Sequence, residues 1–172
     1  MKSNRTVHTP DALHASGADE EWTGNILDRP GFLIRRLHQI HVSLFIEECG
    51  AFDITPVQYS IMSMVELHPG KDQNELGLSI GVDRATLANV VARLEKRALL
   101  KRENATHDRR VKQVYLTAQG RDILAKMAEP ARRAHSRTIE ALPDDARTAF
   151  IQALLVLTEA GNAYSRAPVT PS

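Results

Sequence analysis

The stretch from Asp72 to Thr117 constrains the fold of this chain more than any other, because the spacing of its apolar residues changes along it. A helical pattern up to Ile80 stops at Gly81, and Asp83, a residue type that favours a helix N-cap, follows. Beyond Leu100 polar and apolar residues alternate, as in a strand. The stretch therefore predicts two short helices joined by a tight turn and followed by a β-hairpin.

The second of these helices turns one side inward. Its inward-facing residues are predicted to be Leu87, Val90, Val91, Leu94 and Ala98. In the hairpin, residues 101–103 leave the helix, residues 104–110 form a polar tip, and residues 111–116 return.

Helical patterns also lie on both sides of this stretch. A helix is predicted over about 30–49, with Asp28 as its cap and Pro30 in its first turn. Another begins at Thr55-Pro56 and ends at His68-Pro69-Gly70.

Two more helices follow the hairpin. The first covers about 117–140, where Pro130 should kink or interrupt it. Small residues suited to close helix contact recur along it, namely Ala125, Ala128, Ala131 and Ala134. The last helix begins at Pro143 and continues to Tyr164.

The two outermost helices carry more apolar surface than one chain needs to cover. The first has two adjoining stripes, Leu33, Leu37, Ile40, Leu44 and Ile34, His38, His41, Phe45. The last keeps a strict coiled-coil repeat through Ala146, Phe150, Ala153, Leu157, Ala160 and Tyr164. We expect these helices to pack on each other and on a partner subunit.

The predicted fold is mainly α with a small β-hairpin wing: a winged helix-turn-helix domain plus a helical dimerisation domain. The winged domain covers 55–116, and the dimerisation region combines 28–54 with 117–164. Residues 1–27 are expected to be a disordered tail that contains Trp22, and 165–172 a C-terminal tail.

The charge of the chain is unevenly distributed. Residues 83–116 contain nine basic and four acidic residues, a local charge of +5, whereas the rest carries 13 basic and 17 acidic residues, or −4. A polyanion is the natural partner of such a basic segment.

Several other classes of protein are disfavoured. There is no Gly-rich phosphate loop, His-Glu-x-x-His motif or nucleophile elbow, so we expect no enzyme, no catalytic residues and no cofactor. His38 and His41 lie three apart but have no evident third ligand, so no metal site is predicted. No apolar run is long enough for a membrane span and no signal peptide is evident, so the expected location is the cytoplasm.

The outward side of the second helix suits contact with DNA. Ala85 and Ala92 allow close approach, and beside them stand Thr86, Asn89, Arg93 and Lys96. Asn pairs with adenine edges and Arg with guanine edges, while Lys and Thr mostly hold phosphates. The alternative is an ordinary solvated helix face. Arg109 and Arg110 at the hairpin tip suit a minor groove. The alternative there is a solvated loop paired with Asp108.

The order of elements and the run Asp108-Arg109-Arg110-Val111…Val114-Tyr115-Leu116-Thr117-Ala118-Gln119-Gly120 resemble the MarR family of bacterial regulators. The resemblance covers about 30–164 and includes Val82-Asp83-Arg84-Ala85-Thr86-Leu87. It implies an obligate homodimer whose recognition helices enter successive major grooves of near-palindromic double-stranded DNA. It also implies a location on the nucleoid, in the cytoplasm of a bacterium. By this resemblance Asp108 orients the wing, Arg110 reaches the minor groove, and Arg84 joins the DNA-binding set.

Residues 31–41 and 55–59 resemble the branch of the family that controls the breakdown of aromatic acids. This resemblance implies that Arg35, His38, His41 and Tyr59 bind a planar aromatic carboxylate by ion pairing, hydrogen bonding and stacking. The alternative is that the histidines are interface residues and Arg35 is a surface group.

The predicted function is that of a sequence-specific DNA-binding transcriptional regulator, a homodimeric repressor released by a small aromatic acid; activation is also compatible with the sequence. One alternative is oxidation sensing through Cys49, the single cysteine. Glu47 and Glu48 beside it should raise the thiol pKa, which favours an inert thiol. Another is a winged-helix protein-interaction module, for which a basic face is unnecessary.

Overall fold

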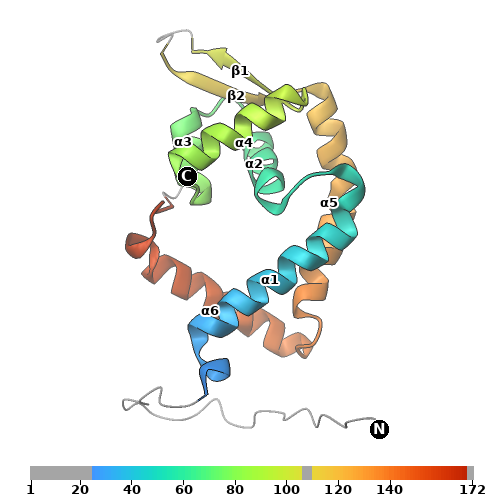
Figure 1. Cartoon of the computed structure of the whole chain (residues 1–172), viewed down its shortest axis with the longest axis vertical. Helices are drawn as coiled ribbons and strands as arrows, with labels where there is room; N and C mark the ends of the chain where they lie inside the picture. The colour runs from blue at the N-terminus through green and yellow to red at the C-terminus, as the bar shows by residue number, and fades with distance from the viewer. Residues whose placement is uncertain (1–24, 106–109, 170–172) are drawn as a thin grey trace.

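A computed structural model describes residues 25–105 and 110–169 (Figure 1). Most of the predicted N-terminal tail, including Trp22, therefore lies outside the described residues, as do Asp108 and Arg109. The helices are α1 (Pro30–Cys49), α2 (Pro56–Leu67), α3 (Gln73–Ile80), α4 (Arg84–Lys96), α5 (Ala118–Ile139) and α6 (Asp144–Ala160). The strands are β1 (Leu100–Asn104) and β2 (Lys112–Leu116), and short 3₁₀ turns are η1 (Ile26–Asp28), η2 (Gly50–Phe52) and η3 (Asn162–Tyr164).

The molecule has a winged part and a helical part. Figure 1 shows α2, α3, α4 and the hairpin gathered at one end, with α1 and α5 leading away from them to α6. The hairpin is antiparallel, with Leu100 opposite Leu116, and an isolated bridge joins Asp72 to Gln113. The mainly α fold with a two-stranded wing is thus confirmed. No helix within the described residues is long and apolar enough to cross a membrane.

One apolar core lies under the winged part and continues between α1 and α5. Its largest fully buried side chains are Phe45, Ile61, Met62, Leu76, Leu87, Leu94, Leu99, Leu100 and Met127. Ala131 and Ala134 on α5 are buried, and α1 packs along this helix more extensively than any other pair of helices. Ala125 and Ala128 are exposed, because only the second half of the alanine series faces inward.

Most helix ends coincide with their sequence signals. Thr55 caps α2 in a reciprocal box with Gln58, and Asp72 and Asp83 accept backbone bonds at the starts of α3 and α4. Gly81 ends α3 in the left-handed conformation, with φ 64°.

Some local predictions are wrong. Asp28 does not cap α1, because it lies inside η1, and Arg29 occupies the cap position without a side-chain bond. Ala98 is exposed with φ 55°, because α4 has already ended. Tyr164 lies in η3 rather than in α6. Of the two effects predicted for Pro130, an interruption does not occur, since α5 continues through this residue.

Candidate functional site

The N-terminal end of α4 is organised by the carboxylate of Asp83. Its Oδ1 accepts bonds from the backbone N–H groups of Ala85 (3.1 Å) and Thr86 (2.9 Å), and its Oδ2 accepts the Thr86 hydroxyl proton (2.6 Å). These bonds from Thr86 hold the pKa of Asp83 below its ordinary value. Because its proton is donated to Asp83, the exposed hydroxyl oxygen of Thr86 can act toward solvent only as a hydrogen-bond acceptor.

The two sides of α4 differ sharply. Leu87, Val90, Val91 and Leu94 are buried in the core. The structure brings six predicted DNA-binding residues together on the exposed side, namely Arg84, Ala85, Thr86, Asn89, Arg93 and Lys96.

The positive charge of this side is not neutralised by its own helix. Within the described residues, Arg84, Arg93 and Lys96 form no ion pair. Glu95 is instead held by Arg102 of β1, whose Nε and Nη2 donate to Glu95 Oε2 at 3.1 and 2.5 Å. This pairing lowers the pKa of Glu95, so the carboxylate stays ionised and turned toward the wing.

The C-terminal end of α4 is tied to the loop after α1. The Arg97 guanidinium donates to the backbone carbonyl oxygens of Phe52 (3.0 Å) and Asp53, and lies 3.5 Å from the Asp53 carboxylate. The sequence does not predict these contacts, because Arg97, Phe52 and Asp53 belong to no recognisable motif.

The wing adds further positive charge beside α4. Arg110 is exposed just before β2, and Lys101 and Lys112 are exposed on the two strands. Lys101 pairs with Glu103 at 2.6 Å, and Lys112 donates to the side chain of Asn104 at 2.5 Å.

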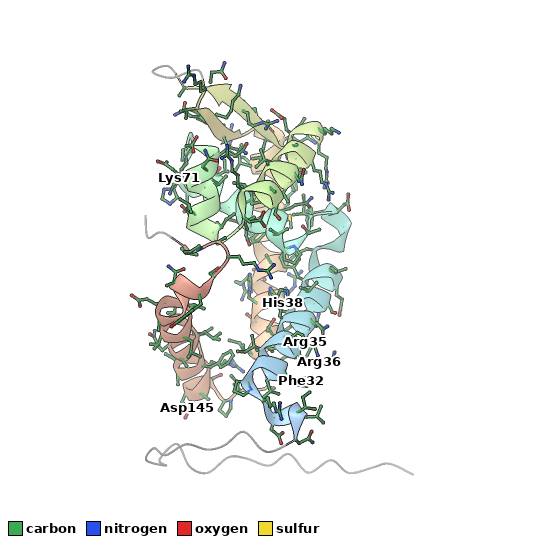
Figure 2. All side chains as sticks on the ribbon, turned by 60° about the vertical axis from the view of Figure 1, so that its left-hand side comes forward. Phe32, Arg35, Arg36, His38, Lys71 and Asp145 are labelled. Carbon is green, nitrogen blue, oxygen red and sulfur yellow. The ribbon has the colours of Figure 1, made fainter. Side chains whose placement is uncertain are left out.

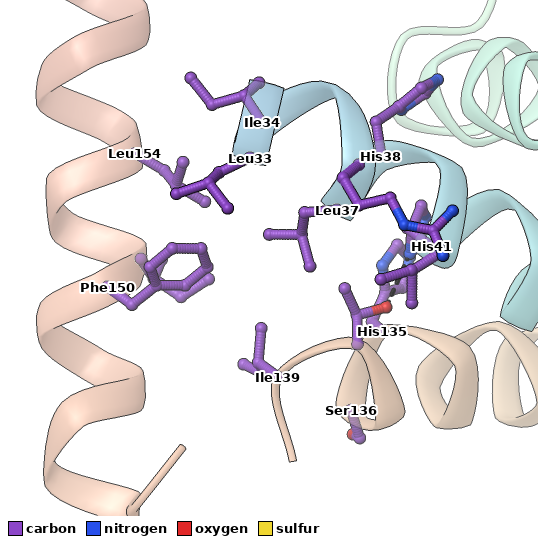
Figure 3. A pocket seen from close by; sticks show the side chains of 14 residues that line it. Leu33, Ile34, Leu37, His38, His41, His135, Ser136, Ile139, Phe150 and Leu154 are labelled. Carbon is purple, nitrogen blue, oxygen red and sulfur yellow. Dashed lines mark hydrogen bonds between the residues drawn. The ribbon is translucent and has the colours of Figure 1, made fainter. Parts of the chain in front are cut away.

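A cavity of about 780 Å³ lies between α1, α5 and α6 (Figure 3). Its walls are mostly apolar. Leu33, Ile34, Leu37, Ile40, Ile139, Phe150, Ile151 and Leu154 line it, together with Arg36, His38, His41, His135, Ser136 and Thr138. Of the four residues predicted to bind an aromatic acid, the cavity thus includes His38 and His41.

Arg35 and Tyr59 lie outside the lining of this cavity. The Arg35 guanidinium lies 5.2 Å from the ring centre of Phe32 (Figure 2), and the Tyr59 ring is tilted against Phe45 at 5.6 Å. Arg36 lines the cavity where Arg35 does not, because successive residues on a helix point about 100° apart.

His41 is the most constrained polar group of the cavity. Its Nδ1 lies 2.9 Å from Thr138 Oγ1, and its ring stacks on His135 with centres 5.0 Å apart. Burial, and then the neighbouring His135 and His38, lower the pKa of His41. His135 and Thr138 were not predicted, because the pattern of α1 does not reveal which residues of α5 face it.

The environment of Cys49 opposes oxidation sensing. The thiol is fully buried, and burial followed by the charge of Glu48 raises its pKa. Glu48 also pairs with Arg133 at 2.8 Å and with Arg137 at 2.8 Å, and so joins α1 to α5.

Comparison with known proteins agrees with this geometry. A model of the MarR family matches residues 52–111. The transcriptional regulator HosA of Escherichia coli is 38% identical over 92 residues, which are 54% of this chain and 67% of HosA. The chain belongs to the MarR family. It is thus a DNA-binding transcriptional regulator with a winged helix-turn-helix.

Other MarR-family proteins resemble the chain over a larger part of its length. The transcriptional repressor NicR of Pseudomonas putida is 28% identical, over 76% of this chain and 82% of NicR. The structure of Bordetella bronchiseptica BpsR, described with regulation by 6-hydroxynicotinic acid, is 25% identical with a TM-score of 0.75 and covers 78% of this chain and 96% of BpsR.

Two further structures carry ligand or DNA. PcaV of Streptomyces coelicolor, in complex with its natural ligand, is 29% identical with a TM-score of 0.72, covering 80% of this chain and 97% of PcaV. The repressor CouR, bound to a 23-mer DNA duplex, is 27% identical with a TM-score of 0.71, covering 76% of this chain and 92% of CouR.

Proposed function

We propose that this MarR-family regulator is a homodimeric repressor that binds a near-palindromic operator through α4 and the wing and is released by a small aromatic carboxylate. The observation that carries the proposal is the exposed side of α4, where three cations without acidic partners in the described residues stand beside Thr86 and Asn89. Asn89 and Arg93 have the chemistry to read base edges, while Arg84 and Lys96 hold phosphates.

Two features support a homodimer. α6 has no buried residue, and its Leu155, Val156 and Leu157 side chains are 55%, 64% and 63% exposed. α1 exposes Leu33 and Ile34 across the cavity from α6. Apolar surface of this extent is unusual on a monomer, and a second copy supplies matching helices.

The cavity supports a small aromatic effector. Its apolar walls suit a planar ring, while Arg36 and His38 offer a cation and a hydrogen-bond donor for a carboxylate. NicR is named a repressor, the DNA binding of BpsR is described as regulated by 6-hydroxynicotinic acid, and PcaV is a regulator in complex with its natural ligand. These relatives favour the same class of control.

DNA binding is tested by fluorescence anisotropy with a labelled duplex from the region upstream of the gene that encodes this protein. We expect affinity to fall steeply with salt and to fall about 10- to 100-fold in Arg93→Ala, since a bidentate base contact contributes about 1–3 kcal/mol. Arg132→Ala is the matched control, because Arg132 is an exposed arginine of α5 paired with Glu129. Absence of binding by the wild type at low salt would refute the proposal.

The effector is tested by thermal shift with benzoate and 6-hydroxynicotinate. A ligand that binds only the folded protein raises its melting temperature. We expect a rise that is lost in His38→Ala and retained in His68→Ala, since His68 ends α2 outside the cavity. No rise with any aromatic acid would remove the effector from the proposal and leave DNA binding in place.

A further inference from the structure

The chain that follows α6 returns to the winged part and lies against the turn between α3 and α4 (Figure 1). After η3, Ser165 has an extended backbone conformation, and the chain bends over residues 165–167. A β carbon placed on Gly81 would lie 3.2 Å from Cγ2 of Val169 and 3.4 Å from the carbonyl oxygen of Ala167. A segment far away in the sequence thus lies close enough to the turn that a side chain at position 81 would touch it.

This segment is held by specific bonds. The Asn162 side-chain amide donates to the carbonyl oxygen of Val169 at 2.7 Å, and its Oδ1 accepts the Val169 backbone N–H at 2.7 Å. Both backbone polar groups of Val169 are thus satisfied, as they would be by a neighbouring strand. Pro168 restricts its own φ and favours extended backbone at Ala167. The proline therefore reduces the number of conformations that the segment must lose when it packs against the turn.

The conformation of the turn favours glycine at position 81. Gly81 has φ 64°, which L side chains rarely adopt, and a side chain there would also meet the C-terminal segment. Two residues later Asp83 caps α4. A contact that holds Gly81 therefore also holds the N-terminal end of the recognition helix.

We propose that residues 161–169 form a strap that binds the α3–α4 turn and ties the recognition helix to α6 of the same chain. The strap goes beyond the proposed function, since it requires neither DNA nor effector. It makes the orientation of α4 depend on α6, the helix whose exposed leucines face a second copy in the proposed dimer.

The strap is tested by hydrogen exchange of the full-length protein without DNA. Asn162→Ala removes both bonds to Val169, and truncation after Arg166 removes the contact with Gly81 altogether. We expect backbone amides over 78–87 to exchange roughly tenfold faster in both variants, because local opening of the turn becomes easier. Thr158→Ala is the matched control, since among residues 25–105 and 110–169 that hydroxyl bonds only the carbonyl oxygens of Leu154 and Leu155 in its own helix.

Unchanged exchange over 78–87 in both variants would overturn the proposal. An equal rise throughout α1 and α5 would overturn it as well, because it would show only a general loss of stability. A second measurement is the affinity for DNA from upstream of the gene, which we expect to fall about threefold or more in both variants. An unchanged affinity would overturn the claim that the strap positions α4. If the wild type binds no DNA, the proposed function fails while the exchange result still decides the strap.

Discussion

At the scale of single residues, His41 links the cavity to the packing of α1 on α5. The Thr138 hydroxyl donates to the carbonyl oxygen of Ala134 at 2.8 Å, so its oxygen accepts the proton of His41 Nδ1. In the neutral ring this leaves Nε2 as an acceptor. A second proton would place a positive charge on a ring that is stacked on His135.

The lowered pKa of His41 predicts acid sensitivity. Below the ordinary histidine value of 6.5 the unfolded chain binds more protons than the folded one, so the stability present above that pH is lost as the pH falls toward the lower folded pKa. We expect the melting temperature to fall more steeply between about pH 7.5 and 5.5 in the wild type than in His41→Phe, as measured by calorimetry. Parallel pH curves for the two proteins would contradict this prediction.

Ala98 predicts a stabilising substitution. It has φ 55°, a conformation that costs an alanine about 1–2 kcal/mol, whereas glycine adopts it freely but loses about 0.5–1 kcal/mol of unfolded-state entropy. We expect Ala98→Gly to raise the free energy of unfolding by up to about 1 kcal/mol in urea titrations. Ala88→Gly, in the middle of α4, should lower it by about 1 kcal/mol. Equal losses in both variants would show that the backbone at Ala98 is unstrained.

At the scale of elements, α4 is held at both ends. Asp83 fixes its beginning, and Arg97 joins its end to the backbone between α1 and α2. Because η2 continues directly from α1, this guanidinium joins the end of the recognition helix to the segment that follows α1.

The tie at Arg97 predicts a measurable loss of stability. Removing two hydrogen bonds donated by a charged group leaves the carbonyl oxygens of Phe52 and Asp53 without that donor, so we expect Arg97→Ala to lower the free energy of unfolding by about 1–2 kcal/mol. Arg97→Lys should recover little of this free energy, because an ammonium group lacks the planar, forked arrangement of N–H donors that a guanidinium offers to two carbonyl oxygens. Arg132→Ala, which breaks an exposed ion pair, should cost about 0–1 kcal/mol. If Arg97→Ala proves as mild as Arg132→Ala, the tie is not structural.

The sequence predicts elements well where a local signal determines them. Thr55, Asp72 and Asp83 begin helices as expected, because their side chains accept bonds from the residues that follow. Asp28 fails because Asn25 starts a separate 3₁₀ turn that includes it. The lining of the cavity was only partly predictable, since His135 comes from a distant helix whose facing side depends on packing.

At the scale of the whole molecule, the two parts satisfy their apolar residues differently. The winged part has a closed core, whereas α6 buries no side chain within its own chain. The predicted repeat from Ala146 to Ala160 lies on α6, but the expected close packing of α1 on this helix is wrong, because a cavity lies between them. Periodicity shows that a helix needs a neighbour, and it does not show whether the neighbour belongs to the same chain.

The exposed face of α6 therefore predicts a dimer that one substitution can break. Leu157 is 63% exposed in the single chain, and a lysine in a helix–helix interface would be buried without a partner. We expect sedimentation of the wild type to show a dimer and that of Leu157→Lys a monomer. Glu66→Lys, at an exposed position of α2 in the winged part, should leave the dimer intact.

The same variant separates assembly from DNA contact. In a dimer, binding of one recognition helix raises the effective concentration of the other at its half-site, and a monomer lacks this gain. We therefore expect Leu157→Lys to bind operator DNA at least about 100-fold more weakly. Its circular dichroism should remain that of a helical protein. Arg93→Ala should show the opposite combination, a dimer with weak binding. A dimeric Leu157→Lys, or a monomeric one that retains full affinity, would place the dimer contact elsewhere or show that DNA binding does not require it.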